Sequence, residues 1–148
     1  MTTQSDSIIR TTIAIIINGL RTHNEKSARD YQIRFVLSRT GRRVALRSGR
    51  SKRVKAQREL TALVLRAGTT RSQRELLALA CSARLIRIAP RRLHDASESC
   101  ASALSAVRDG VADALGVDDR DAEEGGVVAW KYAQERGPYG VRIELSPR

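Results

Sequence analysis

The sequence has few aromatic residues, few cysteines and no long apolar run. Phe, Trp and Tyr make up only 3% of its 148 residues, so a core must be built from Leu, Ile, Val and Ala. Two cysteines, Cys81 and Cys100, are too few for a disulfide framework or an all-cysteine zinc site. No segment approaches the roughly 18 apolar residues of a membrane helix, and no signal-peptide pattern opens the chain. We therefore expect a cytoplasmic protein that is neither secreted nor bound in a membrane.

Motifs of catalysis are scarce as well. The only histidines are His23 and His94, which disfavours a histidine-based zinc site or triad. The chain has no glycine-rich phosphate loop, no HExxH or CxxC motif and no GxSxG elbow. We expect no small-molecule cofactor, and the carboxylates remain as the candidates for chemistry.

Positive charge, in contrast, is abundant and unevenly distributed. Lys and Arg number 27 against 16 Asp and Glu, which gives a net charge of +11 and a pI near 10.9. Residues 1–92 hold 21 basic and 5 acidic residues, whereas residues 93–148 hold 6 and 11. Nine basic residues lie between Arg39 and Arg58, and this window contains no acid.

A basic window of this kind is either a solvated face or a phosphate-binding surface. The acidic second half favours phosphate chemistry, because phosphate binding needs cations and metal-assisted reactions at phosphate need clustered carboxylates, and the sequence has both in separate places. The candidate nucleic-acid contacts are Arg42, Arg43, Arg50, Lys52, Arg53, Lys55 and Arg58.

The apolar pattern predicts strands at four places. They are residues 11–17, 76–88, 127–132 and 141–145, with the turn signal Asn18-Gly19 after the first. Residues 1–10 are polar and expected to be frayed. Within residues 32–49, two short runs flank Ser38-Arg39-Thr40-Gly41, which suggests an inserted basic hairpin.

Two helices are predicted between these strands. The first begins at an N-cap, Ser51, ends before Gly68, and has one apolar face expected to be buried: Ala56, Leu60, Leu63, Val64 and Ala67. The second covers residues 98–115 and ends at Gly116, with a stripe of Cys100, Leu104, Val107, Val111 and Leu115. Cys100 is expected to be a core residue. The order β-α-β-α-β-β predicts one α/β (α+β) domain over residues 1–148, with helices packed on a small mixed sheet.

Acidic residues gather at both ends of the second predicted helix. Asp95 and Glu98 precede it, and Asp118, Asp119 and Asp121 follow it. Three aspartates within four residues repel one another, and a divalent cation would remove that cost. Carboxylate oxygens suit Mg²⁺ or Mn²⁺. The alternative is a solvated acidic loop.

Three segments of the second half carry a family resemblance. They are RIAPRRL (87–93), AVRDGVADALGVDDRD (106–121) and WKYAQERGPYGVRIEL (130–145). In this order they resemble the RusA-like Holliday junction resolvases, especially phage and prophage members, over residues 84–145. RSKRVKAQRELTALVLR (50–66) is a looser match to the first helix of that family, and residues 32–49 look like an insertion. The resemblance implies a bacterial or phage-encoded homodimer that cuts four-way DNA junctions with Mg²⁺ in recombination and repair.

The resemblance also implies site residues. Asp119 matches a metal-binding aspartate of the family, with Asp118 beside it, and Asp95 and Glu98 are the nearest equivalents of the earlier acids. The implied catalytic residues are Asp95, Glu98, Asp118 and Asp119, and the implied metal ligands are Asp95, Glu98 and Asp119. Asp109 and Asp113 match helix positions that look structural.

Other positions depart from the family pattern. Ser99 and Cys100 stand where the family has Asn and Leu, and its characteristic helix Lys falls at Ser105. A DNA-binding relative that has lost catalysis is therefore the alternative, and an RNA-binding protein comes third because the chain lacks aromatic platforms.

A helix of about 18 residues spans roughly 27 Å, so acids at its two ends meet only if the acidic turn reverses over the helix or a partner subunit supplies one set.

Overall fold

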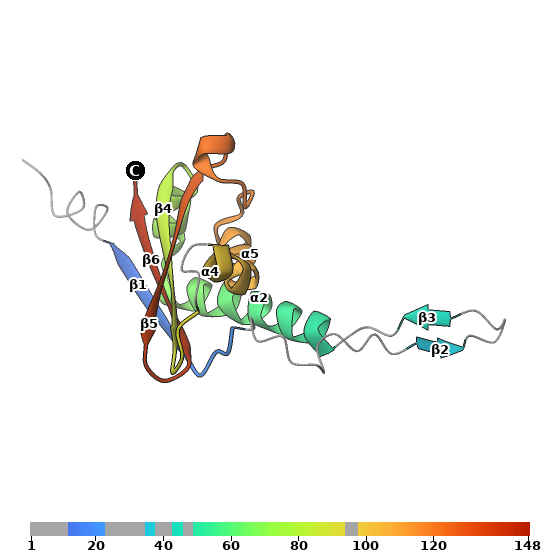
Figure 1. Ribbon diagram of the computed structural model, residues 1–148. Coiled ribbons are helices and arrows are strands. Elements are labelled where there is room, and N and C mark those ends of the chain that lie inside the picture. Colours follow the sequence, from blue (N-terminus) through green and yellow to red (C-terminus); the bar gives the residue numbers. More distant parts are fainter. Residues whose placement is uncertain (1–11, 23–34, 38–42, 46–48, 94–97) are drawn as a thin grey trace, which may run out of the picture.

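The protein has a mixed α+β fold built on a four-stranded sheet (Figure 1). The computed structural model describes residues 12–22, 35–37, 43–45, 49–93 and 98–148, with backbone alone for 35–37, 43–45, 49–51 and 98. The strands are β1 (Ile13–Asn18), β4 (Cys81–Ala89), β5 (Val128–Arg136) and β6 (Gly140–Pro147). They lie in the order β1-β6-β4-β5, and only the β4–β5 pair is parallel. The predicted mixed sheet with packed helices is confirmed at this level.

The helices are α2 (Gly49–Gly68), α3 (Arg71–Leu77), α4 (Glu98–Ala103) and α5 (Ser105–Leu115). In Figure 1, α2, α4 and α5 lie on the same side of the sheet. The core between the layers is aliphatic, and its fully buried members include Leu65, Leu85, Val107, Val111 and Ile143. Cys100 is buried as predicted, and Cys81 is buried as well. Among the described helices, none combines the length and apolarity needed to cross a membrane.

A second, two-stranded sheet lies within the segment expected to be an inserted hairpin. β2 (Phe35–Leu37) and β3 (Arg43–Ala45) pair antiparallel, with Phe35 opposite Ala45. The rest of residues 32–48, and residues 1–11 at the start of the chain, lie outside the described residues.

The predicted strand at residues 76–88 is wrong in its first part. Residues 71–77 form α3, because Thr70 and Gln73 make a capping box: the Gln73 amide donates to Thr70 Oγ1 at 3.2 Å, and the Thr70 amide donates to Gln73 Oε1 at 2.8 Å. The strand β4 begins only at Cys81. The predicted helix at residues 98–115 is likewise divided, since α4 ends at Ala103 and α5 begins at Ser105.

The predicted buried face of α2 is also wrong. The structure buries Gln57, Thr61 and Leu65, while Leu60 and Leu63 are exposed. The reason is the close approach of α5 at Gly110, where a Cβ atom would lie 2.6 Å from the Arg58 carbonyl oxygen. Small and hydrogen-bonded side chains suit this contact, and the Thr61 hydroxyl donates back to the Gln57 carbonyl at 2.7 Å.

Candidate metal and phosphate site

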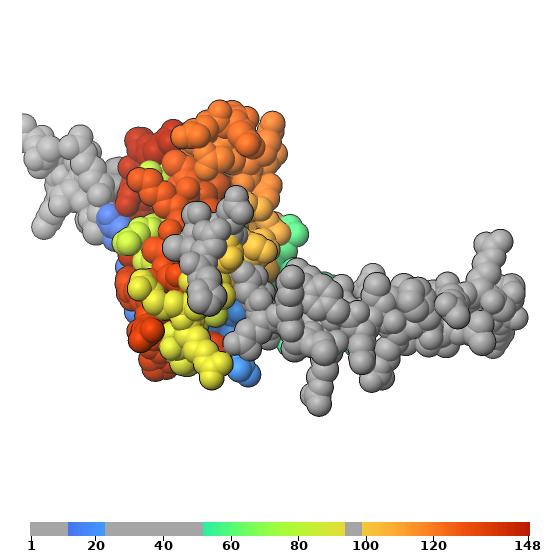
Figure 2. All heavy atoms as spheres, viewed as in Figure 1, coloured from blue at the N-terminus to red at the C-terminus, as the bar shows by residue number. Residues whose placement is uncertain are grey.

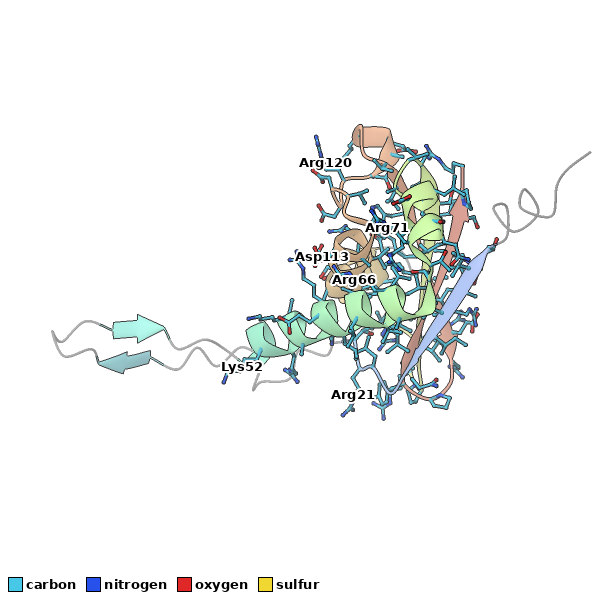
Figure 3. The ribbon with its side chains drawn as sticks, turned by 180° about the vertical axis from the view of Figure 1, so that it is seen from behind. Arg21, Lys52, Arg66, Arg71, Asp113 and Arg120 are labelled. Atoms are coloured by element: carbon cyan, nitrogen blue, oxygen red, sulfur yellow. The ribbon has the colours of Figure 1, made fainter. Side chains whose placement is uncertain are left out.

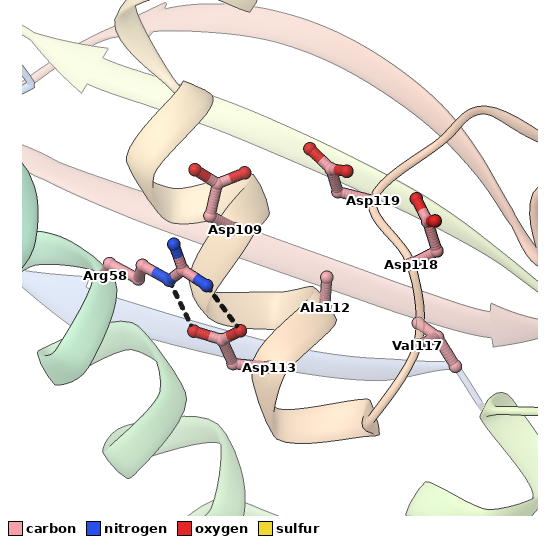
Figure 4. Close-up of a pocket in the computed structure, with 7 residues that line it drawn as sticks. All are labelled: Arg58, Asp109, Ala112, Asp113, Val117, Asp118 and Asp119. Carbon is pink, nitrogen blue, oxygen red and sulfur yellow. Dashed lines mark hydrogen bonds and ion pairs between the residues drawn. The ribbon is translucent and has the colours of Figure 1, made fainter.

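A pocket of about 280 Å³ lies where α2, α5 and the loop after α5 meet (Figure 4). α2 contributes a cation, and the other two elements contribute four carboxylates. The lining residues are Arg58 of α2, then Asp109, Ala112 and Asp113 of α5, and Val117, Asp118 and Asp119 of the loop. The pocket thus places an arginine, which can bind phosphate, beside carboxylates, which can bind a metal ion.

The loop after α5 folds back along that helix. Gly116 ends α5 with a left-handed backbone, φ +68°, and the Val117 amide then donates to the Ala112 carbonyl at 3.0 Å. The reversal brings Asp119 Oδ2 to 3.4 Å from Arg108 Nη2, near the start of α5. The acidic turn therefore reverses over the helix, which is one of the two arrangements that the sequence left open. Figure 2 shows the segment that follows α5, in orange, at one end of the molecule.

Trp130 of β5 fixes the position of this loop. Its indole Nε1 donates to the Asp119 carbonyl at 3.0 Å, and its backbone amide donates to Asp121 Oδ2 at 3.1 Å. Asp121 also caps the short 3₁₀ helix η1 (Ala122–Glu124) by accepting from the Glu123 amide at 3.0 Å. These two amide hydrogen bonds hold the pKa of Asp121 below its usual value. Asp121 is therefore a structural residue of the loop.

Asp118 is stabilised as an anion by its own neighbourhood. It accepts the Arg120 amide at 2.9 Å and the Arg120 guanidinium at 3.2 Å. The amide contact is the main cause of a pKa below the usual value of an aspartate. The crowding of aspartates in residues 118–121 is thus relieved locally, so crowding alone does not require a cation there.

Asp109 and Asp119 are the carboxylate pair of the pocket. Partial burial raises the pKa of Asp109, and the side-chain hydrogen bond to Asp119 and the negative charge of Asp119 raise it further. The helix position of Asp109 looked structural in the sequence, and that interpretation missed its place in the pocket. No spacing rule could have found this pair, because residues ten apart meet only through the loop reversal.

Arg58 and Asp113 link α2 to α5 across the pocket. The guanidinium donates two hydrogen bonds to the carboxylate, at 2.6 and 2.8 Å, as the dashed lines in Figure 4 show. The pair lowers the pKa of Asp113 and raises that of Arg58. Arg66, which lies near Asp113 in Figure 3, donates to the Asp113 carbonyl at 3.2 Å. Arg58 therefore holds the helices together as well as lining the pocket.

The remaining basic residues expected to bind DNA are only partly described. Lys52 and Lys55 are exposed on α2, and Arg53 is half-buried. Figure 3 places Lys52 at the N-terminal end of α2, away from the sheet. Arg42 lies outside the described residues, and the side chains of Arg43 in β3 and Arg50 in α2 are not described.

The acids expected before the second helix are not described either. Asp95 lies outside the described residues, and the side chain of Glu98, which opens α4, does as well. Within the described parts of the chain, no group of three or more His, Cys, Asp or Glu side chains is arranged to hold a metal ion. The pair Asp109 and Asp119 still fits Mg²⁺, because this ion is often held by one or two carboxylates together with water and substrate phosphate. A bound cation would also remove the repulsion within the pair.

The comparisons with known proteins leave the family open. A scan against protein-family models finds no match, and a search of curated proteins finds none. Among solved structures, thiamine-monophosphate kinase from Stenotrophomonas maltophilia aligns with 93% of this chain at 10% sequence identity and a TM-score of 0.36. The chain covers 30% of the length of that kinase. A similarity at this level carries no argument about fold or function.

Proposed function

We propose that this protein is a RusA-like, Mg²⁺- or Mn²⁺-dependent endonuclease that cuts branched DNA. The observation that carries the proposal is the pocket in which the carboxylate pair Asp109 and Asp119 faces Arg58 of the basic helix α2. Cutting a phosphodiester needs cations that hold the phosphate and carboxylates that hold a metal. This pocket offers both within one cavity of about 280 Å³.

The residues in and around the pocket would have different roles. Asp109 and Asp119 would hold the metal ion, which when bound activates water and stabilises negative charge on the phosphate. Lys52 and Lys55, exposed on α2, would hold the DNA backbone. The hydrogen bond from Trp130 to the Asp119 carbonyl keeps the loop, and with it the carboxylate, against α5. The family resemblance adds Asp95 and Glu98 as further proposed ligands.

A second candidate is a relative that binds branched DNA without cutting it. The supporting observation is that arginines already pair with three of the four carboxylates of the pocket: Arg58 pairs with Asp113, Arg108 with Asp119, and Arg120 with Asp118. Carboxylates that are paired in this way are stable anions without a metal ion.

Cleavage of a synthetic four-way junction tests both candidates. We expect the native protein to cut the junction with Mg²⁺ or Mn²⁺ and to leave it intact in EDTA. Asp119→Asn and Asp109→Asn should each lower the cleavage rate at least about 100-fold and leave junction binding intact, because the phosphate contacts remain.

Glu124→Gln, at an exposed acid of η1 outside the pocket, is the matched control and should cut normally. Junction binding without cutting in either metal would favour the second candidate, and absence of junction binding would contradict both.

The single tryptophan gives a second measurement that does not depend on cleavage. Because Trp130 donates to the Asp119 carbonyl, metal binding at Asp119 should change its fluorescence. We expect a saturable change on titration with Mn²⁺ in the native protein and none in Asp109→Asn. An equal response in both proteins would place the metal elsewhere.

A further inference from the structure

Helix α2 has an apolar stripe on the side that faces away from the protein core. Leu60 is 40% exposed and Leu63 is 64% exposed, and Ala56 and Ala67 extend the stripe in both directions as exposed residues. The four residues are spaced by four, three and four, which is the seam spacing of helices that pack side by side in a coiled coil. An exposed apolar stripe of this length on a soluble helix is typical of an interaction surface.

The stripe is symmetric when the direction of the helix is reversed. Two copies of α2 that pack antiparallel, with a two-fold axis between residues 61 and 62, bring Leu60 of each against Leu63 of the other. Ala56 of each then lies against Ala67 of the other, and the small alanines allow close approach at both ends. A surface that complements itself in this way is the requirement for a two-fold symmetric dimer.

The charges beside the stripe have the same symmetry. Glu59 and Arg66 lie on one border of it, seven residues apart, and both line a groove of about 630 Å³ between α2 and the end of α5. In the antiparallel arrangement, Glu59 of one copy lies opposite Arg66 of the other, and the contact occurs twice. A parallel arrangement in register would place Glu59 opposite Val64 and offer no such pair.

We infer that α2 is the surface through which two copies of this chain associate, antiparallel, with Leu60 and Leu63 at the centre. The occupant of the stripe is therefore a second copy of this chain. The inference rests on the stripe and its charges and not on the proposed nuclease activity, so the two can fail separately. Lys52 lies beyond the stretch where the two helices overlap, and Lys55 lies at its end, opposite Gly68 of the other copy, so both stay available for other contacts.

Sedimentation of the full-length protein without DNA or metal tests the inference. We expect a dimer at micromolar concentration, and Leu63→Lys should raise the dimer dissociation constant at least tenfold, because a charged side chain would be buried at the centre of the seam. Leu79→Lys is the matched control: Leu79 is 77% exposed, lies just after α3 and is off the stripe. It should sediment like the native protein. A native protein that is monomeric throughout this range, or a dimer that Leu63→Lys leaves unchanged, would overturn the inference.

Reversal of the two charges tests the antiparallel orientation. Glu59→Arg and Arg66→Glu should each weaken the dimer, because each creates like charges across the seam, and the double variant should restore it. Within one chain Glu59 has a 3.9 Å contact with Lys55 between exposed side chains, which is worth little to folding. Arg66 donates to the Asp113 carbonyl at 3.2 Å, so Arg66→Glu also removes one exposed hydrogen bond within the chain. Circular dichroism of each variant checks the fold. A double variant that is no more dimeric than the single variants would overturn the orientation.

Discussion

Two aspartates one helical turn apart on α5 have opposite electrostatic surroundings. Asp113 accepts two hydrogen bonds from Arg58, which lower its pKa. Asp109 is partly buried beside Asp119, and its pKa is raised. The ionised Asp113 therefore stabilises the folded state, whereas the ionised Asp109 destabilises it. The same substitution at the two positions should have opposite effects on stability. A cost of this kind at a pocket is typical of functional residues.

We predict that Asp113→Asn lowers the melting temperature at pH 7 by a few degrees, whereas Asp109→Asn leaves it unchanged or raises it. The folded-state pKa of Asp113 is depressed, so its stabilisation is present above the unfolded pKa of about 3.9 and is lost as the pH falls through the folded value. The folded-state pKa of Asp109 is raised, so its contribution is present below the unfolded pKa and is lost as the pH rises through the folded value. Thermal denaturation in EDTA from pH 3 to pH 8 measures both variants. Equal decreases at pH 7 would contradict the opposite surroundings of the two carboxylates.

At the scale of elements, the apolar pattern of the sequence predicted that α2 exists but did not predict which of its faces is buried. Leu60 and Leu63 are more apolar than Thr61, so periodicity placed them inside. The structure buries Thr61 because α5 approaches closely at Gly110, and that approach is a property of two helices together. The carboxylate pair of the pocket could not be predicted for the same reason, because it also depends on how two elements pack. The sequence identified Asp119 as a candidate, but only the reversed loop brings its partner Asp109 close to it.

We predict that Gly110→Ala destabilises the protein by about 1–3 kcal/mol, because its methyl group would lie 2.6 Å from the Arg58 carbonyl and force the helices apart. Gly68→Ala is the matched control, since its methyl group would meet only the flexible end of Ile15, at 3.0 Å. Gly110 lies inside α5 and Gly68 at the end of α2, so alanine favours helix formation more at position 110. A net destabilisation at Gly110 therefore reports the clash. Urea unfolding measures the two free energies. A destabilisation at Gly110 no larger than that at Gly68 would contradict the close packing of α2 on α5.

At the scale of the whole molecule, the two faces of the protein carry charge in different ways. On the far face of the sheet, charges are paired with one another: Arg84 of β4 lies 3.7 Å from Glu144 of β6, and Arg142 of β6 pairs with Glu135 of β5 and with Glu144 on its own strand. On the helical side, α2 presents the exposed Lys52 and Lys55 toward its N-terminal end, on the same helix as Arg58 of the carboxylate pocket. If two copies join through α2, the two Lys52 residues lie roughly 28 Å apart along the paired helices, at 1.5 Å per residue. The dimer would thus present two basic ends, as two opposed DNA strands at a junction require.

We predict that DNA binding depends on the basic side of α2 and not on net charge alone. Lys52→Ala with Lys55→Ala should weaken binding to every branched DNA sequence about equally, because phosphate groups carry no base information. The slope of log binding constant against log salt concentration should fall by about one for each phosphate that the variant no longer neutralises.

Arg84→Ala with Lys131→Ala is the matched control: it removes two positive charges from the far face of the sheet, where the two residues lie side by side on β4 and β5. In each pair one residue has a glutamate partner, at 3.9 Å for Lys55 and 3.7 Å for Arg84, so each double variant breaks one similar ion pair within the chain. Fluorescence anisotropy across a salt series measures all three proteins. If the control pair flattens the slope as much as the α2 pair, attraction by overall charge explains the binding and α2 is not the DNA-binding surface.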